Sequence, residues 1–322
     1  HGLAKLVDAL SGSRPELGDA PRWLLLEQAL VRFERARRLL PEDPELAYYT
    51  AYALSRWERR GRDGARETRA DEALEAWRRL RRLAPQYMPA HVAYELAMLH
   101  MRRHEFARAR AEYEAALNAS VPPTLRLADR FYLSVPPERA LRALFAPHAP
   151  ANLYGNLAEA TMLAGDLATA VSRYRRAIDE AAAADEPVTR SLARWGLAVA
   201  LSRAGDHAAA IETAGEALRD DPLPPDDPRF RDLHRRHGPL AVLHLEGVFF
   251  EPRHELHAYR ALGEEAWVRR PDADRDEHLR RALRRWRLFL AEGGVASPFA
   301  GHARARVADL EAALEPDERD PA

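Results

Sequence analysis

Hydrophobic residues recur at intervals of three and four along most of the chain, with polar residues between them. This spacing predicts amphipathic helices, because positions three and four apart share one face of an α-helix. Glycine and proline divide the pattern into segments of helical length. The predicted helices before residue 120 span 3–10, 22–40, 44–60, 65–84, 90–103 and 105–119. Further on, we predict two pairs within 151–222, a pair at 254–268 and 276–292, and a single helix at 298–314.

One signature returns in these segments: Ala, an aromatic residue four positions later, Ala three positions after that, and Pro at the end. It is complete at Ala29, Phe33, Ala36 and Pro41. Full or partial copies begin at Ala73, Ala109, Ala170, Ala210 and Ala282. A period of about 34 to 40 residues is typical of stacked helical hairpins, because a single hairpin cannot bury its own apolar face. The fold class we predict is therefore all-α.

The signature extends over both helices of a pair in the middle of the chain. One copy contains Tyr154, Leu157, Ala158, Gly165, Asp166, Ala170, Tyr174 and Ala177, and the next contains Leu197, Ala198, Leu201, Gly205, Asp206, Ala210, Ala217 and Pro222. These copies resemble the tetratricopeptide repeat (TPR) family. The resemblance implies a right-handed α-α superhelix of about six hairpins with a capping helix over 298–314. We expect one solenoid over 1–315 and a disordered acidic tail at 316–322.

Two segments depart from the repeat. Residues 121–150 are rich in proline, and we predict a shortened, degenerate hairpin there. Residues 221–252 form the second departure, and a structureless loop of this length is uncommon inside a compact array. We therefore expect an ordered insertion whose apolar residues either lie against a groove or fill a gap between repeats. These two segments are where we expect the individual function of this protein.

In TPR arrays the first helix of each pair lines the concave face, so the resemblance implies a set of partner-binding residues. The set is rich in aromatic and Met side chains at its start, which suits an apolar or extended peptide. The alternative is that several of these side chains simply pack between neighbouring hairpins. The set comprises Tyr48, Tyr49, Tyr52, Tyr94, Met98, Met101, Asn152, Asn156, Glu159, Trp195, Val199 and Trp267.

Some members of this family clamp the C-terminal carboxylate of chaperones with Lys, Arg and Asn side chains. The corresponding positions here hold Glu45, His91, Asn152 and Leu192, and Asn156 alone resembles a clamp residue. Binding of a chaperone tail is therefore not expected.

The amino-acid composition limits the classes of partner that we expect. Lys and Arg number 49 against 50 Asp and Glu, which gives a net charge of -1 and argues against a nucleic-acid partner. No apolar run approaches the roughly 18 residues of a membrane span. Cysteine is absent, so neither disulfides nor thiolate metal sites are expected, and both cytoplasm and periplasm remain open. The chain starts at His1 without a targeting stretch, which fits a trimmed chain or an exported one whose leader is gone.

The sequence contains no complete catalytic or metal-binding motif. His254, Glu255 and His257 approach the zinc-protease motif, but Ala258 stands where the second His belongs. His100 and His104 are four apart on a helix, and we interpret these and the other histidines as solvated or capping groups. There is no phosphate loop or nucleophile elbow. We expect no enzyme activity, cofactor or metal, and we leave the oligomeric state open.

The function we predict is a non-catalytic scaffold or adaptor that binds a protein or an extended peptide on its concave face. Two alternatives stand beside it. One is a peptide- or metabolite-sensing regulator that uses 221–252 as a lid. The other is an exported component of envelope assembly.

Overall fold

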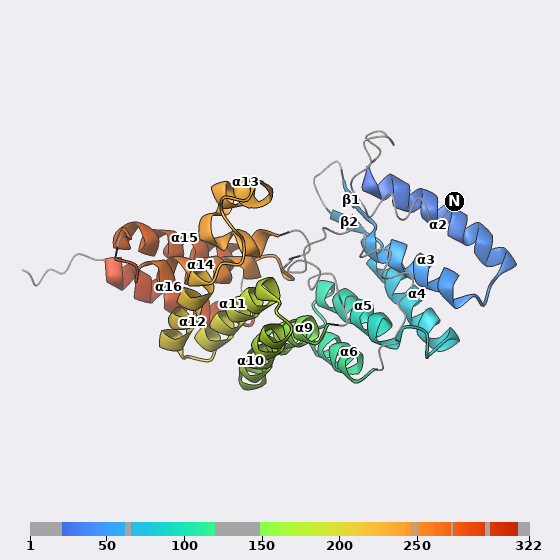
Figure 1. Cartoon of the computed structure of the whole chain (residues 1–322), viewed down its shortest axis with the longest axis horizontal. Coiled ribbons are helices and arrows are strands. Elements are labelled where there is room, and N and C mark those ends of the chain that lie inside the picture. Colours follow the sequence, from blue (N-terminus) through green and yellow to red (C-terminus); the bar gives the residue numbers. More distant parts are fainter. Residues whose placement is uncertain are drawn as a thin grey trace, which may run out of the picture. The chain divides into compact units, whose positions relative to one another are not determined.

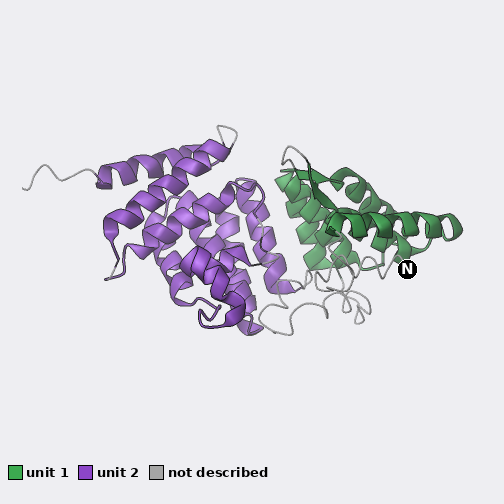
Figure 2. Ribbon diagram, turned by 90° about the horizontal axis from the view of Figure 1, so that it is seen from above, with its two compact units in different colours: residues 1–138, 145–148 green, residues 139–144, 149–322 purple. Residues whose placement is uncertain are grey.

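A computed structural model describes the chain over residues 21–61, 66–119, 149–245, 248, 250–271, 273–293 and 297–314. The described chain is all-α apart from one two-stranded sheet, as Figure 1 shows. It divides into two compact units (Figure 2): unit 1 comprises 1–138 and 145–148, and unit 2 comprises 139–144 and 149–322. In each unit, helices that follow one another in sequence pack together. The single array over 1–315 stays a prediction.

Unit 1 contains five described helices, and each packs against the next. Proline starts two of them, as expected for a residue whose missing N–H is not needed in the first turn. The side chain of Asp43 also accepts a hydrogen bond from the Leu46 amide at 2.7 Å, which caps the second helix. The helices are α2 (Arg22–Leu39), α3 (Pro44–Arg56), α4 (Ala70–Leu83), α5 (Pro89–Arg102) and α6 (Phe106–Asn118).

The prediction of continuous helices over 44–60 and 65–84 is wrong at their facing ends. The chain there forms an antiparallel hairpin of β1 (Glu58–Arg60) and β2 (Arg66–Thr68). Arg59 forms an ion pair with Glu67 across the strands at 2.5 Å. Its guanidinium also lies over the rings of Trp23 and Trp57. These contacts between strands and with α2 replace the helical hydrogen bonds that the sequence alone favours.

The recurring signature supplies the core of both units. The aromatic residues Phe33, Trp77 and Tyr113 are each at most 5% exposed in unit 1. The alanines that begin the copies are fully buried, which lets paired helices approach closely. The residues of the signature therefore serve to pack paired helices together, as the sequence predicts.

Unit 2 contains the helices of the middle repeats and the C-terminal helices. Gly165 and Gly205 each adopt a φ of 93° between paired helices, a left-handed conformation that favours glycine. Asp166 and Asp206 follow and cap the next helix through their side chains. Glycine thus separates the paired helices here, as the sequence predicts, and the following Asp caps the next helix. The helices are α9 (Pro150–Leu163), α10 (Leu167–Ala183), α11 (Pro187–Arg203), α12 (His207–Arg219), α13 (Pro228–His237), the 3₁₀ helix η3 (Gly238–His244), α14 (Glu255–Trp267), α15 (Arg275–Gly293) and α16 (Ala300–Leu314).

The described part of 221–252 is ordered, as predicted, and forms α13 and η3. Leu240 of η3 lies between α11 and α14. A Cβ atom built on Gly263 would fall 2.8 Å from Leu240 Cδ2 and 3.3 Å from the ring of Trp195. Leu240 thus packs beside helices α11 and α14, which agrees with the second of the two expected arrangements. The predicted degenerate hairpin lies outside the described residues, except where α9 begins.

The single C-terminal helix packs on the preceding pair. Helix α16 contacts α15 and buries Ala300, Ala303 and Leu310 against it. This matches a terminal helix that shields the last hairpin. The predicted disordered tail lies outside the described residues.

Candidate functional site

Of the twelve predicted partner-binding residues, six belong to unit 1 and six to unit 2. Five are partly exposed: Tyr94, Asn152, Asn156, Glu159 and Trp267. The other seven are less than 9% exposed, which corrects the expectation that they face an open groove: Tyr48, Tyr49, Tyr52, Met98, Met101, Trp195 and Val199. Their packing matches the alternative of contacts between neighbouring hairpins. Partner contacts through the five partly exposed residues stay a prediction.

The three predicted tyrosines of α3 form an aromatic core in unit 1. Tyr48 lies edge-on to Trp77 at 5.3 Å between ring centroids and stacks on Tyr52 at 6.0 Å. Tyr49 stacks on Phe33 of α2 at 6.2 Å. Helix α3 contacts both α2 and α4, so tyrosines on different sides of it are all covered. Aromatic pairs at these distances stabilise a core beyond their buried area.

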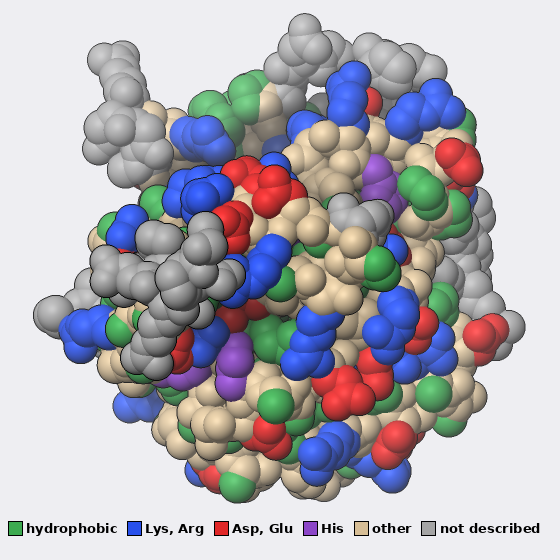
Figure 3. Space-filling view, turned by 90° about the vertical axis from the view of Figure 1, so that its left-hand side faces the viewer, with side chains coloured by type: hydrophobic (Ala, Val, Ile, Leu, Met, Phe, Trp, Pro, Cys, Tyr) green, Lys and Arg blue, Asp and Glu red, His purple; other side chains and the backbone are tan. Residues whose placement is uncertain are grey.

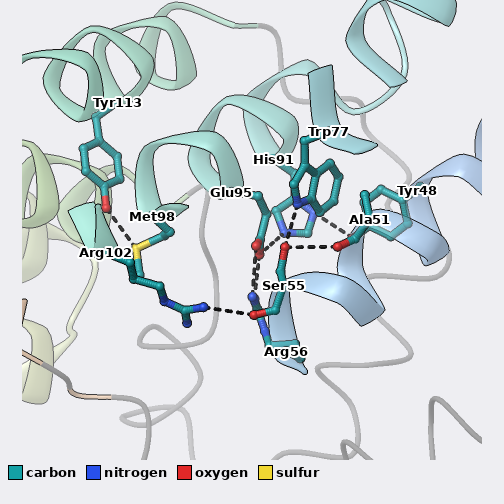
Figure 4. A network of polar contacts seen from close by, with 10 residues as sticks. All are labelled: Tyr48, Ala51, Ser55, Arg56, Trp77, His91, Glu95, Met98, Arg102 and Tyr113. Carbon is teal, nitrogen blue, oxygen red and sulfur yellow. Dashed lines mark hydrogen bonds and ion pairs between the residues drawn. The ribbon is translucent and has the colours of Figure 1, made fainter. Parts of the chain in front are cut away.

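A buried polar network joins α3 to α5 beside these rings (Figure 4). Tyr48 Oη lies 2.8 Å from His91 Nδ1. The Nε2 atom of the same imidazole lies 3.4 Å from Oε1 of Glu95. Glu95 in turn accepts two hydrogen bonds from Arg56, at 2.6 and 2.9 Å. The network runs from a phenol through an imidazole and a carboxylate to a guanidinium.

Glu95 is the electrostatic centre of this network. Burial alone would raise the pKa of its carboxyl group, but the charge of Arg56 and the hydrogen bond with His91 lower that pKa to about 2. Glu95 is 1% exposed and stays ionised at neutral pH. Such a carboxylate orients its neighbours and is not suited to donate protons. One indication of this network is visible in the sequence: His91 and Glu95 are four residues apart and therefore lie on the same face of a helix.

A second set of hydrogen bonds links the same helices through Ser55. Trp77 Nε1 donates to Ser55 Oγ at 2.7 Å, and that hydroxyl donates to the Ala51 carbonyl at 3.0 Å. Arg102 of α5 donates to the Ser55 carbonyl at 2.9 Å. Figure 4 shows both sets side by side. We infer that these two sets of hydrogen bonds hold α3, α4 and α5 together.

Glu159 is the predicted residue with the most unusual surroundings in unit 2. Its Oε2 accepts hydrogen bonds from Tyr174 of α10 and, at 2.7 Å, from Tyr259 of α14. Burial raises the pKa of Glu159, and the hydrogen bonds from the two tyrosines offset this only in part. Burial and the neighbouring Glu159 raise the pKa of both phenols well above 10. The phenols are neutral donors at any physiological pH.

An ion pair between Arg203 and Glu255 lies near this carboxyl. Both side chains are 1% exposed. The Arg203 guanidinium lies 3.7 Å from the ring centroid of Phe299. The pair joins the end of α11 to the start of α14, and the ring covers the charge from the side of α16. Sequence reasoning named Glu255 only within an incomplete zinc-protease motif and did not pair it with Arg203, which is 52 residues away.

Unit 1 has an open groove on the other side of α3. Its volume is about 610 Å³, its floor is α3, and its walls are α2 and α4. Apolar side chains reach into it from all three helices, among them Leu30, Val31, Leu40, Leu46 and Ala76. Val31 and Leu40 are 47% and 57% exposed, so this groove leaves large apolar side chains open to solvent.

Elsewhere the surface charge is mixed. Arginine and acidic side chains are interspersed on the face drawn in Figure 3. The arginine-rich helix α4 shows such pairs. Arg81 and Arg82 of α4 pair with Glu112 and Glu75 at 2.8 and 2.7 Å. Such exposed pairs contribute little to stability.

A metal site and a membrane-spanning helix are both absent from the part of the chain that the structure describes. No group of three or more His, Asp or Glu side chains is placed to hold a metal ion among these residues. None of the described helices is both long and apolar enough to cross a lipid bilayer.

No protein-family model matches this chain, and no curated protein matches it. The class that the structure itself defines is therefore coarse. It is an all-α chain of helices packed in sequence order against their neighbours.

Proposed function

We propose that this protein is a TPR-like helical-repeat adaptor without catalytic activity, which binds a partner protein. The repeat signature, its burial in both units and the Gly-Asp turns support a TPR-like solenoid. The observation that carries the binding role is the exposure of Val31 and Leu40 in the groove of unit 1. Exposed apolar side chains that gather in a groove are a common feature of protein-binding sites.

The charges around this groove favour an acidic partner. Its glutamates are already paired within the chain: Glu34 with Arg37, Glu27 and Glu72 with Arg69, and Glu75 with Arg82. Arg35 and Arg38 also line the groove, and neither forms an ion pair with a described residue. The occupant we propose is an extended peptide of a partner protein, with apolar residues flanked by Asp or Glu.

Selection of random 12-residue peptides displayed on phage tests this proposal with the full chain as bait. We expect enriched sequences that combine large apolar residues with Asp or Glu. Leu40→Asp should weaken binding of a selected peptide by about tenfold or more, because it places a charge in the apolar groove. Leu39→Asp is the matched control, since Leu39 is 82% exposed on the same helix but does not line the groove. Equal binding to both variants would contradict the site.

The alternative of a ligand-sensing regulator has support from one observation. Residues of α13 and η3, within 221–252, line a pocket together with α14 and α15. In this alternative the segment closes over a small ligand. Its test is a change in the scattering profile of the protein when a ligand for that pocket is added, and identical profiles would count against it.

A further inference from the structure

Unit 2 contains a pocket of about 680 Å³ that none of the sequence motifs marks. Its walls are the junction of α13 with η3, one face of α14 and one face of α15. Pockets for small ligands usually measure about 300 to 1,000 Å³. Arginines from three of these elements line this one: Arg236, Arg260, Arg281, Arg284 and Arg285.

Arg260 of α14 is the half-buried member of this set. Its Nη2 lies 2.6 Å from His244 Nε2 and 3.4 Å from His237 Nδ1, and the two imidazole rings stack at 3.6 Å. Arg260 forms no ion pair with a carboxylate among the described residues. Guanidinium groups withdrawn from water are normally paired, but the charge of Glu264 acts on Arg260 without forming an ion pair with it, so no described carboxylate contacts this guanidinium directly.

Arg285 of α15 adds a second positive charge and likewise has no ion pair with a described residue. Burial lowers the pKa of Arg260, and the charge of Arg285 lowers it further, so the two charges repel one another. Glu264 is the one acidic residue in the described lining of the pocket. Its Oε2 lies 2.7 Å from Nδ1 of His278, and its charge partly offsets the lowering of the pKa of Arg260 without an ion pair between the two.

The two histidines beside Arg260 do not neutralise the site. Burial lowers the pKa of His244 to about 4, with a further contribution from Arg260. Burial also lowers the pKa of His237. Both rings are therefore neutral at pH 7, and they supply polar atoms without negative charge.

We propose that this pocket binds a small organic phosphate, with the phosphate group on Arg260 and Arg285. Two guanidinium groups suit a divalent phosphate monoester better than a monovalent carboxylate, since their forks match its oxygens and its charge. Apolar side chains of the same pocket, Leu240, Leu288 and Trp267, face the organic part. This site is independent of the groove in unit 1 and of the peptide proposed for it.

Calorimetric titration of the full chain in phosphate-free buffer tests the proposal with phenyl phosphate, inorganic phosphate and benzoate as probes. We expect phenyl phosphate to bind most tightly and benzoate most weakly. Equal affinity for phenyl phosphate and inorganic phosphate would overturn the role of the apolar side chains. Absence of binding by both phosphates would overturn the site.

Substitutions assign the binding to named residues. Arg260→Gln and Arg285→Gln should each weaken phenyl phosphate binding by about tenfold or more, because each removes a charged hydrogen-bond donor. Arg280→Gln is the matched control, since Arg280 lies on α15 beside Asp276 and does not line the pocket. An equal loss in the control would point to a general charge effect and contradict the proposal.

Thermal unfolding separates a binding role from a structural one. Without ligand, Arg260→Gln should raise the melting temperature, because it removes a half-buried charge that forms no ion pair with a described residue and is repelled by Arg285. With phenyl phosphate, the wild type should gain stability and the variant should not. A variant that is less stable alone, yet still gains stability from the ligand, would overturn the assignment.

Discussion

Glu95 and Glu159 show how neighbours decide the state of a carboxyl group. Glu95 faces the cation Arg56, and its pKa is lowered to about 2. Glu159 faces two phenols, and its pKa is raised by burial. The same residue type is thus held charged in unit 1 and shifted toward its neutral form in unit 2. The stability contributed by Glu95 therefore increases as the pH rises, whereas the stability contributed by Glu159 decreases.

For Glu95 we expect Glu95→Gln to destabilise unit 1 by about 2 kcal/mol at pH 7, because Arg56 then loses its counter-ion. The folded pKa is lower than the unfolded value near 4.5, so the stabilisation is present above pH 4.5 and disappears as the pH falls toward 2. Urea unfolding of both proteins between pH 7 and pH 3 measures this. A difference that stays constant over that range would contradict it.

For Glu159 we expect the stability of the wild type relative to the glutamine variant to change with pH in the opposite direction. In Glu159→Gln the amide oxygen still accepts from both tyrosines, and no charge is buried. The folded pKa of Glu159 is raised, so the wild type is favoured at low pH and loses stability as the pH rises through that value. The melting temperature of the variant should equal that of the wild type near pH 4 and exceed it at pH 8. A lower melting temperature at pH 8 would show that the carboxylate itself is needed.

At the scale of elements, the approach of α11 to α10 depends on one glycine. A Cβ atom on Gly196 would lie 2.2 Å from Tyr174 Cε1, so alanine there must displace the ring that holds Glu159. We expect Gly196→Ala to cost roughly 1 to 3 kcal/mol of unfolding free energy. Gly155→Ala in α9 is the control, because that site is open. The control should gain up to about 1 kcal/mol from helix propensity, and chemical denaturation measures both.

Much of the helical framework follows from local sequence. Proline and glycine set most helix boundaries within a few residues, since they act through the backbone of their own turn. The hairpin after α3 was not predictable, because Glu58, Arg59 and Arg60 favour a helix by propensity. Their strand is set by Glu67, Trp23 and Trp57, which are brought together only by the fold.

The candidate site was less predictable than the framework. The tyrosines of α3 suggested an exposed face, but whether a helix is covered on one side or two depends on its neighbours. Trp267 was named from the sequence and does line a pocket. Neither Arg260 nor Arg285 was expected to line a pocket: Arg285 was interpreted as part of a solvated arginine-rich face, and a lone arginine such as Arg260 carries no local sign that a carboxylate partner is absent.

At the scale of the whole molecule, each unit has its own hydrophobic core. The core of unit 1 centres on Tyr48 and Trp77, and that of unit 2 includes Trp195 and Trp286. We expect two calorimetric unfolding transitions, with Glu95→Gln shifting one and Gly196→Ala shifting the other. A single transition that both variants move equally would show that the units unfold as one.

The place of Leu240 between α11 and α14 bears on how such a chain is lengthened or shortened. Duplicating or excising one hairpin preserves an array when every boundary is alike. At this boundary the spacing of the helices is set by a leucine from outside the pair and by the bare backbone of Gly263. A hairpin transplanted here from another part of the chain would not have the residues that pack against Leu240. The hairpins on either side are therefore not interchangeable parts, and a designer would have to transplant 221–252 with them.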